Sequence, residues 1–384
     1  RAALDGIYSY YRSAFYSSSL DGFSSPRLKW VGTDLIGHDQ RAYNLQDLLS
    51  PSNDFVRDVY WVPCYRIIYD TNVIIGRSEF EGVELTPDEK IRIQAEARFF
   101  RGYMYEILAD VYGGVPLVLE ETTQPKRDYV RVSREETYQQ ARDDLKFAAE
   151  NLPDIKDVPD YMVNNLVASH MLAVVYLSLE QWDNAINSAS IVIDNPNMAL
   201  MTERFGSRVN DTYNPLYPWA SGGDPYWDLF RIDNQNRSSG NRETLWAIQF
   251  KYNVPGGMNG GYGFEQTQCP RTWQLKVKNK NGKSVNLLPY PNTYYGGKGT
   301  GAMKISDYYY EYVWKRSGYD QDIRNSSYNI IRDVTVPNPE SDYYGKWLFK
   351  DKVPLAKYDE YRDWFPIVAK AACMGDHPLD VWVE

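Results

Sequence analysis

The residue types that carry most enzyme chemistry are sparse in this sequence and lack the spacing that such chemistry needs. Its histidines and cysteines lie far apart, at His38, His170, His377, Cys64, Cys269 and Cys373. They form no H-E-x-x-H motif and no zinc-ligand spacing, and no G-x-S-x-G nucleophile motif occurs. We therefore expect neither a metal site nor a bound cofactor. His170 stands among apolar residues inside an expected helix, and we expect it to be a packed or a capping histidine.

Two glycine-containing segments match phosphate-binding motifs only in part. Gly282-Lys283-Ser284 fits the end of a P-loop, but Val277 stands where the first glycine is required. The segment 297–302 fits the loose G-x-G-x-x-A pattern, yet no apolar strand leads into it. With 51 acidic residues in the chain, a glycosidase carboxylate pair stays open as an alternative, although no spacing points to one.

Aromatic residues in polar, glycine-rich segments are the strongest chemical signal. A sugar ring presents a face of C–H bonds that packs on an aromatic plane, and its hydroxyl groups need planar polar partners. Such partners are interleaved with the rings, for example Asn214, Asp224 and Arg231. The sequence therefore predicts a carbohydrate-binding surface with these candidate ligand-binding residues: Trp30, Tyr43, Trp219, Tyr226, Trp227, Tyr262, Trp273 and Tyr294.

The alternative for each of these rings is a place in the core, because large aromatic side chains are highly buried on average. The excess of tyrosine over phenylalanine, 33 against 13, favours partly solvent-exposed positions for these rings, since tyrosine has an apolar body and a polar tip. We expect two or three members of the set to face solvent.

The elements that must position these rings begin with helices. Thr86 and Glu89 have capping-box spacing, and apolar residues then recur every fourth position as far as Gly113-Gly114. This pattern predicts a long, largely buried helix over 86–114. Its charged residues are expected to form ion pairs rather than to act in catalysis: Glu96, Arg98, Arg101 and Asp110.

A second helical block follows. Ser133 and Glu136 repeat the capping-box spacing and open a helix that ends before Pro153. The segments 163–179 and 182–193 then form a pair with small residues at packing positions, a pattern typical of a tetratricopeptide repeat. Such pairs bury their apolar faces only against neighbours, so we expect further pairs, with 55–75 and 88–112 as candidates.

The composition changes near residue 201, where Gly, Pro, Asn, Tyr and Trp begin to dominate and only 245–250 has the pattern of a strand. Long loop-rich regions on a rigid scaffold are usually functional. We therefore expect a mostly α-helical fold in which tetratricopeptide-like helical pairs support an irregular ligand-binding region with a few short strands. Residues 1–200 would form the scaffold, and residues 201–384 the ligand-binding region packed on it.

Overall composition excludes several classes of protein. Charged residues at 24% and hydrophobic residues at 43% are typical of a folded globular chain. The 42 basic and 51 acidic residues give a net charge of −9, which argues against affinity for nucleic acid phosphates. No run reaches the roughly 18 apolar residues of a membrane span.

One block resembles a known family. The segment 95–118, AEARFFRGYMYEILADVYGGVPLV, is similar to the signature AEArFlRAyyY…yGgvPlv of the SusD/RagB family, outer-membrane nutrient-binding lipoproteins of Bacteroidetes. Shorter segments resemble the family in the same order, at 2–8, 69–75, 227–230, 243–246 and 319–324. The family's lipidated cysteine and first helix would precede Arg1, and its closing helical part would follow Val368. We expect this chain to lack both.

The resemblance implies a scaffold of four tetratricopeptide-like pairs and an irregular ligand-binding side. It also implies a lipid-anchored protein on the cell surface, at the outer membrane, that acts as a lid on a SusC-like TonB-dependent transporter. The ligand would be an oligosaccharide or polysaccharide, bound without catalysis. No site residue follows from the motif, because the ring-stacking residues vary within the family.

Three other functions stay open on the sequence. A peptide-binding relative would use the same scaffold to feed a peptide transporter, and a tetratricopeptide adaptor would bind a partner's peptide in its helical groove. A glycan-degrading enzyme would need two facing carboxylates. We prefer glycan binding, because stacking at about 0.5–1.5 kcal/mol per ring gives loose capture, roughly millimolar to micromolar, which suits delivery to a transporter.

Overall fold

A computed structural model describes residues 1–16, 33–39, 50, 54–251, 254–255, 257, 267–314 and 321–376. The chain divides into two compact units. The helical unit comprises Arg1–Tyr16, Gln46–Leu200 and Arg242–Gln249, and the irregular unit comprises Ser17–Leu45, Met201–Asn241 and Phe250–Glu384. The fold is mostly α-helical, with tetratricopeptide-like helical pairs and a few short strands.

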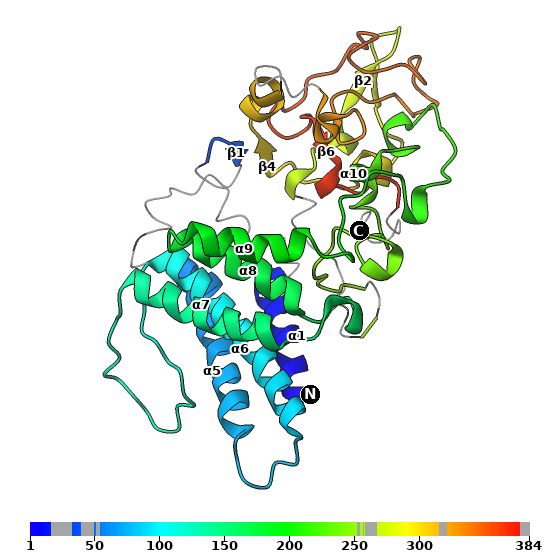
Figure 1. Cartoon of the computed structure of the whole chain (residues 1–384). Helices are drawn as coiled ribbons and strands as arrows, with labels where there is room; N and C mark the ends of the chain where they lie inside the picture. The colour runs from blue at the N-terminus through cyan, green and yellow to red at the C-terminus, as the bar shows by residue number, and fades with distance from the viewer. Residues whose placement is uncertain are drawn as a thin grey trace. The chain divides into compact units, whose positions relative to one another are not determined.

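Helices of the helical unit pack on their neighbours along the chain: α5 on α6, α6 on α7, α7 on α8 and α8 on α9 (Figure 1). Their bounds are α1 (Ala2–Tyr16), α4 (Asp54–Val56), η1 (Arg57–Trp61), α5 (Val62–Arg77), α6 (Pro87–Tyr112), α7 (Arg134–Asn151), η2 (Ile155–Asp157), α8 (Asn165–Ser178) and α9 (Trp182–Ile193). None of the helices that the structure describes has both the length and the apolar composition needed to span a membrane.

Both predicted capping boxes are confirmed. The Thr86 hydroxyl accepts from the backbone N–H of Glu89 at 3.2 Å, and the Glu89 carboxylate accepts from the Thr86 backbone N–H at 2.9 Å. Ser133 and Glu136 make the same pair of bonds at 3.1 and 2.8 Å. At the end of α6, Gly113 adopts a φ of 76°, which glycine reaches without steric cost.

The residues of the 95–118 block have structural roles. Arg101 makes a bidentate ion pair with Asp144 at 2.7 and 2.8 Å and donates to the Asn72 carboxamide oxygen at 2.8 Å. Asp144 is fully buried. Gly102 brings α6 close to α7, because a Cβ there would lie 2.9 Å from the Ala141 carbonyl oxygen.

The other charged residues of α6 also behave as predicted for the most part. Glu96 pairs with Arg1 at 2.9 Å, and Arg98 lies 3.7 Å from Asp144. Asp110 instead accepts a hydrogen bond from the Tyr138 hydroxyl at 2.5 Å.

Two predictions about the helical unit are wrong. His170 is exposed, because α8 buries only part of its surface and His170 lies on the other side. The segment 245–250 is not a strand. Its apolar residues pack within the helical unit instead, where the Trp246 ring stacks on Tyr11 at 5.6 Å and the Ala247 N–H donates to the Asp160 carbonyl at 3.0 Å.

The irregular unit is built from short elements around its own core. In the described residues, three antiparallel two-stranded ladders form: β1 (Ile36–Asp39) with β4 (Met303–Ile305), β2 (Lys276–Lys278) with β3 (Ser284–Asn286), and β5 (Ile330–Ile331) with β6 (Ile367–Val368). The short helices are η3 (Gly206–Arg208), η4 (Pro218–Ala220), α10 (Pro225–Asp228), η5 (Arg237–Ser239), η6 (Thr272–Gln274), η7 (Thr293–Tyr295), η8 (Tyr308–Val313), η10 (Ile323–Asn325) and η11 (Ala369–Ala371). Figure 1 shows how turns and loops connect these pieces.

Candidate functional site

A cavity of about 360 Å³ in the irregular unit combines aromatic and polar side chains. We call it the η8 pocket. Its lining comes from five separate stretches of the chain: Tyr226, Tyr309, Val313, Trp314, Arg324, Asn329, Ile330, Val368 and Lys370. Its volume lies in the range of small-molecule sites, which are concave, largely apolar and supplied with a few polar groups.

The β5–β6 ladder brings one part of this lining together. Ile330 pairs with Val368 across the ladder, and the Ala369 N–H donates to the Asn329 carbonyl at 3.0 Å. Ile330 is buried in a small core with Tyr310 and Trp314. The ladder therefore places apolar side chains of β5 and β6 in the lining, with Asn329 and Lys370 next to them.

Tyr226 reaches the pocket from α10, and Asp224 fixes that helix. The Asp224 carboxylate accepts from the Trp227 N–H at 2.8 Å, which caps α10. It also accepts from the Ser326 hydroxyl at 2.6 Å and from the Asn329 carboxamide at 2.8 Å. One carboxylate thus joins α10 to the segment that precedes β5, and Tyr226 stays half-buried at the pocket wall.

Tyr309 comes from η8 and Trp314 directly follows it; η8 is a π-helical turn of the kind that is frequent at functional sites. Tyr310 anchors this turn, since its ring is 2% exposed and its hydroxyl donates to the Pro366 carbonyl at 2.7 Å. The rings of Tyr309 and Trp314 meet edge to face at 5.7 Å. Burial raises the pKa of Tyr309, so its hydroxyl stays protonated and able to donate at neutral pH.

Arg324 and Lys370 supply positive charge to the lining. Arg324 donates from Nε to Asp322 at 2.9 Å and from Nη2 at 2.5 Å, and this pairing lowers the pKa of Asp322. Lys370 is exposed, with its Nζ 5.0 Å from the centroid of the Phe230 ring. The pocket therefore offers aromatic rings for a sugar's C–H face and N–H or O–H donors for its oxygens.

A second group of rings lies elsewhere in the irregular unit, and we call it the tyrosine surface: Tyr217, Tyr290, Tyr294 and Tyr344. Tyr217 and Tyr294 stack at 4.2 Å with an interplanar angle of 10°. Tyr290 and Tyr344 are 56% and 50% exposed. Burial raises the pKa of Tyr217, and the other three tyrosines lie near enough to raise it further.

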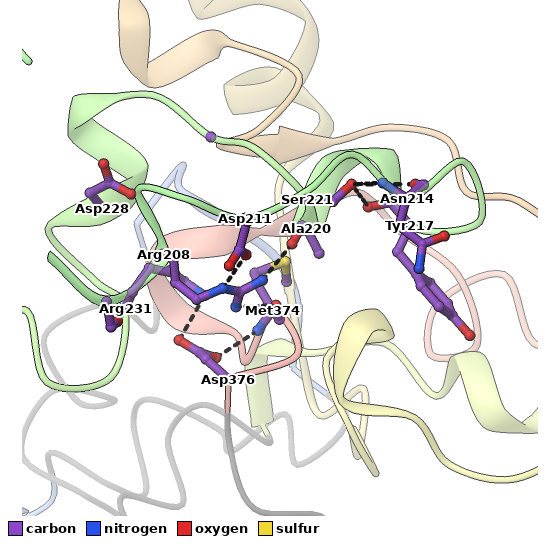
Figure 2. A network of polar contacts seen from close by, with 12 residues as sticks. Arg208, Asp211, Asn214, Tyr217, Ala220, Ser221, Asp228, Arg231, Met374 and Asp376 are labelled. Atoms are coloured by element: carbon purple, nitrogen blue, oxygen red, sulfur yellow. Dashed lines mark hydrogen bonds and ion pairs between the residues drawn. The ribbon is translucent and has the colours of Figure 1, made fainter. Parts of the chain in front are cut away.

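A polar network holds the loop that carries Tyr217 (Figure 2). The Ser221 hydroxyl accepts from the Asn214 N–H at 2.8 Å and donates to the Tyr217 carbonyl at 2.9 Å. Arg208 pairs with Asp211 and donates to the carbonyls of Ala220 at 2.7 Å and Met374 at 3.1 Å. These bonds tie segments far apart in the sequence to one another, so the loop is positioned by the core of the unit.

Two of the predicted ligand-binding residues are core residues, and the prediction that they face a ligand is wrong. Trp227 is fully buried, with Arg231, Arg208 and Arg204 at 4.5, 5.3 and 5.8 Å from its ring. Trp219 is 3% exposed and donates from its indole N–H to the Tyr294 carbonyl at 2.8 Å. Both rings pack in the main apolar cluster of the irregular unit, which leaves no face for a ligand.

The structure separates the remaining candidates. Tyr226 lines the η8 pocket and Tyr294 belongs to the tyrosine surface. Trp273 is half-buried against the main apolar cluster, and its indole N–H donates to the Gly299 carbonyl at 3.0 Å. Three further candidates lie outside the described residues: Trp30, Tyr43 and Tyr262.

Sequence reasoning missed most of the η8 pocket, including Tyr309, Trp314, Arg324 and Lys370. A signal was present in the tyrosine-rich run 308–312, which stands out in the sequence. The basic residues carried no signal, because only the β5–β6 pairing and the η10 turn bring them to the same cavity.

A cavity of about 370 Å³ in the helical unit also contains rings, but its groups are already engaged with one another. Tyr11 stacks on Trp246, and the Trp246 indole N–H donates to the Tyr161 carbonyl at 2.8 Å. Arg12 donates to the Gln249 carbonyl at 3.0 Å. Across the described part of the chain, no group of three or more His, Cys, Asp or Glu side chains could hold a metal ion.

Comparison with known proteins agrees with this architecture. The family model SusD-like_3, described as "Starch-binding associating with outer membrane", matches residues 32–177. SusD-like protein P25 of Formosa agariphila is 22% identical over 207 residues, which cover 52% of this chain and 33% of the relative.

Solved structures share the fold at low sequence identity. B. fragilis NanU matches with a TM-score of 0.59 and 16% identity over 96% of this chain and 65% of its own. A laminarin-binding SusD-like protein matches with a TM-score of 0.58 and 15% identity over 97% of this chain and 71% of its own. Several other solved relatives are longer, and the matches cover 47%, 54% and 58% of their chains. The match of residues 32–177 to the family model, together with the fold shared with solved SusD-like proteins, makes this chain similar to the SusD/RagB family in both sequence and fold.

Proposed function

We propose that this protein binds a glycan in the η8 pocket without cleaving it. The observation that carries the proposal is the composition of that pocket, in which Tyr226, Tyr309 and Trp314 line the same cavity as Arg324, Asn329 and Lys370. Rings and hydrogen-bonding groups side by side match the two surfaces of a sugar. The proposal is supported by the SusD-like fold, which a laminarin-binding protein shares.

Binding without catalysis is part of the same proposal. Glycosidases act with two carboxyl groups that flank the scissile bond at separations of roughly 5–9.5 Å. The described residues that line the η8 pocket carry no carboxyl group. Hydrolysis is tested by incubating the protein with a glycan that it retains. Release of new reducing ends would contradict the proposal that the protein binds the glycan without cleaving it.

We further propose that the protein delivers its glycan to a SusC-like TonB-dependent transporter and is held at the outer membrane by a lipid anchor that precedes Arg1. The description of the matching family model as outer-membrane-associated supports this location. The test is co-purification of the full-length protein with such a transporter from membranes. Recovery of the protein in the soluble fraction without a transporter would contradict the assignment.

The test of binding is affinity electrophoresis against plant, host and microbial glycans, with a peptide mixture in a parallel binding assay. For a retained glycan, Tyr226→Ala and Tyr309→Ala should each weaken binding about three- to tenfold, the loss of one stacked ring. Neither residue is fully buried, so both variants should stay folded.

Tyr290→Ala on the tyrosine surface is the matched control, since it also removes one accessible tyrosine of the irregular unit. We expect it to bind like the parent protein. If Tyr290→Ala weakens binding while the two pocket variants do not, the glycan site is the tyrosine surface rather than the η8 pocket. Retention of peptides but of no glycan would instead support the peptide-binding alternative.

A further inference from the structure

We propose that the η8 pocket selects glycans that carry an anionic group, with a uronic acid carboxylate as the primary case and a sulfate ester as the second source of the same charge. This inference rests on the proposed function and names the class of sugar that the pocket takes.

The charge of the pocket lining favours an anionic ligand. The chain as a whole carries a net charge of −9, with 51 acidic against 42 basic residues. Among the described residues that line the η8 pocket, the charged ones are Arg324 and Lys370, and both are basic. A cavity lined by one sign of charge concentrates ligands of the opposite sign, even when the whole protein has the ligand's sign.

The carboxylates next to the pocket, Asp224 and Asp322, already accept hydrogen bonds from protein groups. Asp224 accepts from the Trp227 N–H, the Ser326 hydroxyl and the Asn329 carboxamide. Asp322 is 15% exposed at its side chain and accepts from Nε and Nη2 of Arg324. Both acidic groups therefore already have donors of their own in the folded protein.

The two basic side chains of the lining are accessible to solvent. Lys370 is exposed and has no carboxylate partner among the described residues. Arg324 uses Nε and Nη2 for Asp322, and its side chain is 57% exposed. Guanidinium and ammonium donors form their strongest hydrogen bonds with carboxylate and sulfate-like oxygens.

A third cation, Arg332, contacts the two turns that carry Tyr309 and Arg324. Its guanidinium donates to the Tyr310 carbonyl at 3.2 Å and to Asn325 at 2.7 Å, and it lies near enough to Tyr309 to influence its ionisation. Burial lowers the pKa of Arg332, and Glu311, on the same turn as Tyr309, acts in the opposite direction; Glu311 is not among the described residues that line the pocket. An anionic sugar would thus place its ring against Tyr226 or Tyr309 and its charge toward Lys370 and Arg324.

The experiment compares each anionic polysaccharide with its own neutral form. The probes are polygalacturonate and alginate with their carboxyl-reduced counterparts, a sulfated galactan with its desulfated counterpart, and the neutral glucan laminarin. Binding is measured by affinity electrophoresis at low and high salt. We expect at least one anionic form to bind about tenfold more tightly than its neutral counterpart, with a preference that shrinks in high salt.

Two variants assign this preference to the pocket. Lys370→Gln should reduce the ratio between anionic and neutral forms about three- to tenfold, and binding of the neutral form should change little. Lys350→Gln removes an exposed lysine of the irregular unit that does not line the pocket, and the ratio should stay as in the parent.

The outcomes separate the two proposals. Tighter binding of a carboxylate form or of a sulfate form supports the inference and identifies the source of the charge. Equal or weaker binding of every anionic form, with laminarin or another neutral glycan retained, overturns the inference and leaves glycan binding intact. Retention of no probe and of no neutral glycan overturns glycan binding itself. A preference that survives Lys370→Gln unchanged overturns the assignment to this pocket.

Discussion

Replacing Trp227 is a direct test of its reassignment from ligand contact to core residue. Its side chain is fully buried, and three guanidinium groups lie within 5.8 Å of the ring centroid. A Trp→Ala change in a core costs about 3–5 kcal/mol, and each buried cation–π contact adds roughly 0.5–2 kcal/mol. Because Arg204, Arg208 and Arg231 all keep carboxylate partners when the ring is removed, we leave the cation–π contacts out of the sum and expect Trp227→Ala to lower the free energy of unfolding by about 4 kcal/mol, the middle of the core range.

The assay is urea unfolding followed by near-ultraviolet circular dichroism. With a slope of about 2–3 kcal/mol per molar, the loss corresponds to a midpoint shift of roughly 1–2 M. Trp227→Phe keeps an aromatic ring over Arg231, 4.5 Å away in the parent, and should lose less than half as much. Trp182→Ala removes a 57% exposed ring from α9 and should stay within about 0.5 kcal/mol of the parent.

The result that would refute this reasoning is a Trp227→Ala protein that unfolds at the parent's urea midpoint and yet no longer retains its glycan. Such a protein would show that the ring contacts the ligand and that the burial of Trp227 is not what stabilises the irregular unit.

Two further predictions concern the helical unit. Arg101→Leu should lower the free energy of unfolding by about 3–5 kcal/mol, because it removes the bidentate cation of the fully buried Asp144 carboxylate and leaves Arg98 at 3.7 Å. The double change with Asp144→Leu should recover part of that loss in urea unfolding. The hydrogen bonds of the second capping box lower the pKa of Glu136 in the folded protein. The ionised Glu136 therefore stabilises the folded state fully above the unfolded pKa of about 4.3, and this stabilisation is lost as the pH falls through the lower folded pKa. Glu136→Gln keeps the cap but cannot ionise, so its urea midpoint should fall less than the parent's between about pH 6 and pH 3. If the parent and Glu136→Gln lose stability equally in acid, the role of the ionised Glu136 is contradicted. If Arg101→Leu is as stable as the parent, the stabilising role of the Arg101–Asp144 pair is contradicted.

Local signals in the sequence were enough to predict most of the helical unit. Thr86 and Ser133 start α6 and α7 as their spacing to Glu89 and Glu136 predicted. The pair 163–179 and 182–193 became α8 and α9 within two residues of the expected bounds. These features are readable because a capping box and a helical stripe depend on residues three or four positions apart.

The apolar segment 245–250 shows where such reading fails. Its composition favours a strand, but a strand exists only when another strand pairs with it, and Trp246 packs on Tyr11 instead. The same limit applies to Trp219 and Trp227. Their glycine-rich surroundings suggested exposure, yet contacts from Tyr294 and the three arginines bury them.

By itself, the sequence determined the helical scaffold, the resemblance to a known family and the presence of many rings in the second half of the chain, since these follow from neighbouring residues and short motifs. The tertiary structure alone decided which rings line a pocket. Tyr226, Tyr309 and Lys370 are separated by scores of residues and meet only because the β5–β6 ladder and the Asp224 carboxylate hold their segments together. Burial is a property of such long-range contacts, so one tryptophan becomes core and a nearby tyrosine becomes a candidate ligand contact.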